Sequence, residues 1–153
     1  MVCMKWHENC RYMELPREYT SEELAKFHGH LGPFIVLGYR MGKYALQYFD
    51  NDPFSIFATV YCSGTTPESC LMDGVQIGSG CTLGKRNIEL VPSQTAEVMF
   101  RHADGRAILI KPGDYMKYKS DYDSLDPELA LEHFAEAMYS MEDTDLFVVT
   151  ELR

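Results

Sequence analysis

The stretch that decides the fold is Phe27-His-Gly-His-Leu-Gly-Pro-Phe-Ile-Val-Leu-Gly-Tyr-Arg-Met-Gly42. Two glycines flank His30 and favour a turn, and Pro33 suits the first position of a helix because its missing amide would be unpaired there. Apolar residues then recur at nearly helical spacing as far as Phe49. The stretch therefore predicts a turn followed by a long helix over residues 33–49.

Gly38, Gly42 and Ala45 lie near one face of this predicted helix. A glycine inside a helix costs about 1 kcal/mol relative to alanine, so close packing against another element is the expected compensation. Spacing alone leaves open whether that element belongs to the same chain or to a partner.

The sequence on either side predicts a mixture of helices and strands. Thr20 with Glu23 matches a capping box, which predicts a short helix ending near Phe27. Further elements are predicted by β-branched runs, turn residues and capping residues: strands at 55–62, 85–91, 95–101, 106–111 and 146–150, and helices over 66–77 and from 126 onward. Helices grouped around a mixed or antiparallel sheet indicate an α+β fold with about three to four helices. Within the last helix the buried candidates include Leu129, Leu131, His133, Phe134 and Met138.

Length and composition indicate one globular domain. The chain has 153 residues, 46% of them hydrophobic, and a formal net charge of -9. We expect an N-terminal segment over residues 1–19 and a core domain over residues 20–153. The negative charge disfavours nucleic-acid binding, and no apolar run approaches a membrane span. The start of the chain has no apolar signal core, so we expect a cytoplasmic protein whose five cysteines are reduced thiols or metal ligands.

Four residues form the sharpest candidate site: His28, His30, Cys70 and Cys81. The histidines precede a predicted helix N-terminus, whose field favours the neutral imidazole that binds metal. Cys70 falls in the first turn of the next predicted helix, and Cys81 lies near basic residues; both settings favour a thiolate. Two imidazoles and two thiolates suit tetrahedral zinc.

Structural interpretations of the same residue types remain open. Buried cysteines such as Cys62 or Cys70 can pack as small apolar residues, and either histidine of the turn can cap a helix or bond a carbonyl. Cys3, His7 and Cys10 are candidate additional ligands, although a mobile chain end is the alternative interpretation.

Residues 27–42, together with Ser69-Cys-Leu-Met-Asp-Gly-Val-Gln-Ile-Gly-Ser-Gly-Cys-Thr-Leu-Gly-Lys-Arg-Asn87, resemble the signature of the FmdE family of formylmethanofuran dehydrogenase subunits. The resemblance covers residue 20 to the C-terminus. It implies an α+β core, commonly a homodimer, with a metal-associated pocket built from the His-x-His and Cys motifs. Asp73, Gln76 and Lys85 become expected neighbours of that pocket.

The chain departs from the family pattern in two respects. Many members have Cys where this chain has Gly32 and Gly where it has Phe34, so a ligand used elsewhere in the family is missing here. Many members also carry a C-terminal zinc-finger module, which we do not expect in this chain. The resemblance implies no reaction, because the namesake protein accompanies a molybdenum or tungsten enzyme whose redox centre lies in other subunits.

Three functional hypotheses follow. The first is a domain that binds a divalent metal, most simply zinc, with Asp73 orienting an imidazole and Lys85 holding an anionic group. The second is a non-catalytic accessory subunit that binds a small ligand or a redox-enzyme partner, with Gly38 and Gly42 at the interface. The third is thiol redox chemistry between Cys70 and Cys81, which requires the two sulfurs within disulfide reach.

Overall fold

The computed structural model describes residues 10–153 of the chain. The strands span Ile56–Cys62 (β1), Ile88–Pro92 (β2), Glu97–His102 (β3), Ala107–Pro112 (β4) and Phe147–Leu152 (β5). The α-helices span Ser21–His28 (α1), Pro33–Tyr48 (α2), Leu71–Ser79 (α3), Pro127–Ser140 (α4) and Asp143–Leu146 (α5). Three short 3-10 helices span Arg11–Glu14 (η2), Glu68–Cys70 (η3) and Tyr115–Tyr122 (η4).

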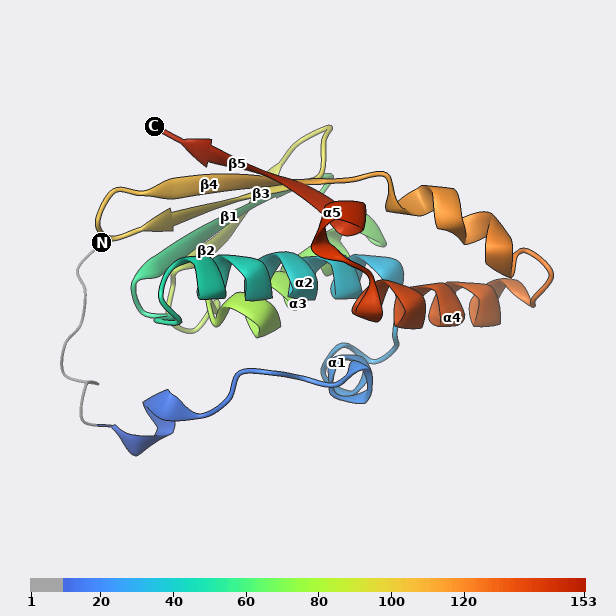
Figure 1. Cartoon of the computed structure of the whole chain (residues 1–153), viewed down its shortest axis with the longest axis horizontal. Helices are drawn as coiled ribbons and strands as arrows, with labels where there is room; N and C mark the ends of the chain where they lie inside the picture. Colours follow the sequence, from blue (N-terminus) through green and yellow to red (C-terminus); the bar gives the residue numbers. More distant parts are fainter. Residues whose placement is uncertain (1–9) are drawn as a thin grey trace.

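The strands form one mixed sheet in the order β2-β1-β3-β4-β5, and α2 with α3 lies against one of its faces (Figure 1). β1 and β2 are parallel, and every other neighbouring pair is antiparallel. The predicted α+β fold and its hairpin, formed by β3 and β4, are therefore confirmed. None of the helices in residues 10–153 is long and apolar enough to span a membrane.

Alternate strand residues supply the core. Ala58, Phe100 and Ile108 lie opposite one another on β1, β3 and β4, and all three are fully buried. Ile56 and Ile110 are also fully buried. Because successive residues of a strand point to opposite faces, this set faces the helices and fixes the register of the sheet.

α2 and α3 touch backbone to backbone, and glycines make this contact possible. A Cβ added at Gly38 would lie 2.3 Å from the carbonyl oxygen of Leu71, and one at Gly74 would lie 2.1 Å from that of Ile35. The predicted close packing of the glycine face is confirmed, and its partner is a helix of the same chain. Gly38 and Gly42 are buried in this contact, so they are not available as the partner interface of the second hypothesis.

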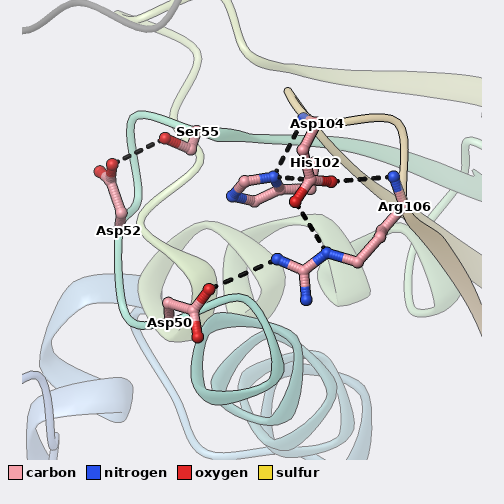
Figure 2. Close-up of polar contacts among 6 residues, drawn as sticks. All are labelled: Asp50, Asp52, Ser55, His102, Asp104 and Arg106. Carbon is pink, nitrogen blue, oxygen red and sulfur yellow. Dashed lines mark hydrogen bonds and ion pairs between the residues drawn. The ribbon is translucent and has the colours of Figure 1, made fainter.

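A polar cluster ties the hairpin to the end of α2 (Figure 2). Arg106 donates from Nε to Asp104 Oδ2 at 2.8 Å and forms a 3.4 Å ion pair with Asp50. Asp50 and Asn51 have φ angles of 62° and 61°, a left-handed conformation that Asp and Asn tolerate better than most residues. The backbone N–H of Arg106 is the main cause that lowers the pKa of Asp104. This cluster closes the end of the sheet opposite the helix N-termini.

The structure corrects several details of the sequence analysis. β2 begins at Ile88 rather than at residue 85. The sequence does not predict η4, because residues 115–122 show no helical period. In α4 the predicted burial is right for Phe134 and Met138. It is wrong for Leu129, which is half exposed, and for Leu131 and His133, which are exposed as well.

Candidate metal centre

Three chain segments bring His28, His30 and Cys70 together. His28 is the last residue of α1, which ends because Gly29 adopts the left-handed conformation at φ 105°. His30 lies in the turn before α2, and Cys70 is the residue that precedes α3. The glycine contacts follow the same order along α2 and α3, so the N-termini of these two helices lie side by side, with His30 before one and Cys70 before the other.

The potential ligand atoms of these three residues all lie within 4.8 Å of one another. The Nδ1 atom of His28 lies 2.6 Å from Asp73 Oδ2, which fixes the orientation of the ring. The other ring nitrogen, Nε2, is buried and has no hydrogen-bond partner among residues 10–153. Burying a polar nitrogen without a hydrogen-bond partner costs roughly 1–3 kcal/mol of folding free energy. The unpaired Nε2 atom therefore indicates that His28 binds a ligand.

Cys70 is half-buried, and the pKa of its thiol moves against the direction that the sequence predicts. Burial raises the pKa of Cys70, and the nearby Asp73 carboxylate raises it further. The field at the helix N-terminus favours the thiolate. The pKa of Cys70 is raised overall, so a cation in the cluster would have to displace a proton from the sulfur.

A cavity of about 710 Å³ opens beside the cluster. Its wall includes His28, His30 and Cys70, together with apolar side chains such as Phe34 and Leu131. A volume of roughly 300–1,000 Å³ is typical of small-molecule sites. The arrangement therefore combines three potential ligand side chains with space for a small organic molecule.

Sequence reasoning missed the far wall of this cavity. Met116 and Lys119 come from η4, and Glu128, Leu131 and Glu132 come from α4. Met116 is 52% exposed and Leu131 is 42% exposed, although both are apolar. The signal in the sequence is weak, since an apolar Tyr115-Met116 pair in an aperiodic stretch does not by itself indicate a site.

Cys81 is not part of the cluster. It follows the C-terminal end of α3, whereas Cys70 precedes the N-terminal end. An α-helix rises 1.5 Å per residue, so the length of α3 places Cys70 and Cys81 roughly 15 Å apart. That distance is well beyond disulfide reach. The thiol-redox pair of the third hypothesis is therefore not formed by this geometry. Burial raises the pKa of Cys81 to about 11, against the expected lowering by nearby basic residues.

The buried thiol of Cys81 predicts a loss of stability in alkali. At pH values between the ordinary thiol pKa and about 11, the Cys81 thiol has lost its proton in the unfolded chain and keeps it in the folded chain. The free energy of unfolding should therefore fall as pH rises, by about 2 kcal/mol from pH 8 to pH 10.5. Urea unfolding at both pH values measures this fall in the wild type and in Cys81→Ala. Equal falls in the two proteins would contradict the prediction.

Two other predicted neighbours, Gln76 and Lys85, lie on a different cavity. Gln76 accepts a hydrogen bond from the backbone N–H of Leu83, and the Lys85 ammonium donates to the carbonyl of Gly80.

Of the N-terminal candidates, Cys3 and His7 lie outside the described residues, and Cys10 is exposed.

The two departures from the family pattern both lie at the candidate metal centre. A Cβ added at Gly32 would lie 3.0 Å from Cε1 of His30, so a side chain at this position would press on the ring. Phe34 forms part of the cavity wall. This chain therefore leaves room around His30 and adds an aromatic ring to the cavity.

A solved structure supports the fold, and a curated protein resembles part of the sequence. A crystal structure of a tungsten formylmethanofuran dehydrogenase FmdE-like protein, from Syntrophus aciditrophicus, superimposes with a TM-score of 0.56 at 21% identity, over 89% of this chain and 73% of that one. A probable S-adenosyl-L-methionine-binding protein of Archaeoglobus fulgidus is 34% identical over 93 residues, which is 56% of this chain. This chain spans only 24% of that relative's length.

The family comparison covers most of the chain, including His28, His30 and Cys70. The model described as FmdE, molybdenum formylmethanofuran dehydrogenase operon, matches residues 27–148. That range contains the His28 turn, the Cys70 helix start and every strand except the last part of β5. The chain therefore belongs to the FmdE family.

Proposed function

We propose that this chain binds one zinc ion through His28, His30 and Cys70 and presents it to a small molecule in the adjoining cavity. The observation that carries the proposal is the buried Nε2 atom of His28, which has no partner among residues 10–153 while Asp73 holds the opposite side of the ring. A metal ion would satisfy that nitrogen.

The donor set suits zinc. Two imidazoles and one thiolate form a three-ligand set of the kind found in catalytic zinc sites. The present spacing, within 4.8 Å, needs only small side-chain rotations to reach the roughly 3.5 Å that separates ligands of tetrahedral zinc. When bound, zinc with three protein ligands keeps a fourth position for water or substrate and acts there as a Lewis acid.

The protein's own groups define the rest of the site. Asp73 accepts a hydrogen bond from the Nδ1–H group of His28, which sets the tautomer and leaves Nε2 as the ligand atom. Phe34 and Leu131 form apolar parts of the cavity wall beside the cluster. Lys119 and Glu128 lie on the same wall, so they can contact polar groups of the bound molecule.

The family description connects these proteins with a molybdenum formylmethanofuran dehydrogenase operon. We include in the proposal that this chain serves that type of metabolism, as a partner of a redox enzyme. The homodimer and the cytoplasmic location expected from the sequence stay predictions.

Zinc titration of untagged, metal-stripped protein tests the proposal. We expect one zinc ion per chain, released by a competing chelator. Cys70→Ser should weaken zinc binding by about a hundredfold because a hydroxyl is a much poorer zinc ligand than a thiolate.

Cys81→Ala provides the matched control, since Cys81 lies at the other end of α3. It should keep full zinc stoichiometry and affinity. The proposal is wrong if no stoichiometric zinc binds, or if Cys70→Ser and Cys81→Ala have equal effects. In the first of these cases the accessory-subunit hypothesis becomes the better account.

A further inference from the structure

A second cavity, of about 740 Å³, lies beside α1 and has no part in the proposed metal centre. Lys26 and Phe27 line it, whereas the next residue, His28, lines the first cavity. The loop after α3 and the turn at Pro53 and Phe54 form other parts of its wall. Its volume is again typical of a small-molecule site.

Side-chain hydrogen bonds hold the loop in place. Gln76 Oε1 accepts from the backbone N–H of Leu83 at 3.0 Å, and Asn87 Oδ1 accepts from that of Thr82 at 2.9 Å. Asn87 also donates to the carbonyl of Pro53 at 3.1 Å, which connects the loop to the neighbouring turn. The wall is therefore formed before any ligand arrives, which lowers the entropy cost of binding.

The fixed walls carry large apolar side chains into solvent. Leu83 is 66% exposed and Phe27 is 61% exposed, and both line the cavity. Ile77 and the Phe54 ring lie on the same wall. Exposed apolar groups gathered around a hollow are typical of a ligand site, since a ligand would remove them from water.

The charge of the cavity is opposite to that of the chain. Arg17, Lys26 and Lys85 line it, against a single acid, Glu23, in a chain of net charge -9. The Glu23 carboxylate already accepts from the backbone N–H of Thr20 in the capping box. None of the three cations forms an ion pair with a carboxylate of residues 10–153.

Lys85 is the most confined of these cations. Its ammonium donates to the carbonyl of Gly80 and lies 4.7 Å from the centre of the Phe54 ring. Burial lowers the pKa of Lys85. A half-buried ammonium that has no ion-pair partner in the described part of the chain gains from an anion that enters the cavity.

We infer that this cavity is a second binding site, for an organic anion with a flat apolar body. The apolar part would lie between Phe27 and Leu83, and the anionic group would approach Lys26 and Lys85. The inference does not depend on the proposed zinc ion, because no residue of the His28, His30 and Cys70 cluster lines this cavity.

Two fluorescent probes of the same shape test the inference on the full chain. Anilinonaphthalene sulfonate carries an anionic group, and phenylnaphthylamine has the same ring system without it. We expect the anion to bind at one site per chain, at least about tenfold more tightly than the neutral probe, because of the cations that line the cavity. Equal affinities, or no binding of the anion, would overturn the inference.

A pair of charge reversals identifies the cavity. Lys26→Glu should weaken binding of the anion by about fivefold, with little effect on the neutral probe. Lys117→Glu makes the same charge change at an exposed lysine of η4 that lines neither cavity, and it should leave the affinity within about twofold. Leu83→Asp should weaken binding of both probes. Equal effects of the two lysine variants would show non-specific attraction and contradict the inference.

Discussion

Gly74→Ala is expected to destabilise the protein by more than about 3 kcal/mol or to prevent folding. The new methyl group would lie 2.1 Å from the carbonyl oxygen of Ile35 and 2.6 Å from the backbone nitrogen of Tyr39. Both atoms belong to the backbone of α2, which cannot turn aside as a flexible side chain could. The two helices would have to separate, and the buried contact between them would be lost. Urea unfolding measures the change in the free energy of unfolding.

Gly84→Ala is the matched control for this prediction. A Cβ added at Gly84 would meet nothing within 4 Å, and its backbone does not require a left-handed conformation. We expect a change within about 0.5 kcal/mol, or slight stabilisation through a less flexible unfolded chain. If the two alanine variants were equally stable, the backbone contact between α2 and α3 would not exist in solution.

If the proposed metal centre is right, His28→Ala should weaken zinc binding by about a thousandfold, the largest effect that we expect of any single substitution there. Structural zinc sites bind with roughly 10–16 kcal/mol, so one ligand of three accounts for about 4 kcal/mol. The change also leaves the Asp73 carboxylate without the imidazole that it contacts at 2.6 Å. Competition with a chelator of known affinity measures the loss.

His133→Ala removes a histidine of a different kind. His133 lies on α4, is about half exposed, and forms a surface ion pair with Glu136. Its replacement should leave zinc affinity unchanged, because surface ion pairs contribute little to binding elsewhere. Loss of zinc from this variant, or retention of zinc by His28→Ala, would refute the proposed ligand set.

The sequence is most informative where local chemistry decides local structure. The capping box at Thr20, the proline that begins α2 and the hairpin at Gly105 all form as predicted. The glycine face of α2 correctly indicates a close neighbour. It does not identify that neighbour, because Gly74 and Gly78 on α3 lie more than thirty residues away in the sequence.

The candidate site is only partly predictable for the same reason. His28, His30 and Cys70 each stand beside a helix end that the sequence indicates, so the turn and capping residues define their positions. Cys81 follows α3 rather than preceding it. Only the length and direction of α3 show that Cys81 lies far from His28, His30 and Cys70. The walls contributed by η4 and α4 depend on long-range packing, which no local pattern records.

The contact between α2 and α3 has a consequence for how this protein could be changed. His30 precedes α2 and Cys70 precedes α3, so the distance between these two residues depends on how closely the two helices pack. The spacing of the proposed ligand atoms therefore depends on Gly38, Gly42, Gly74 and Gly78, which lie along these two helices. A larger ion would need a wider spacing of the two helices, which the backbone contacts at those glycines do not allow without loss of stability.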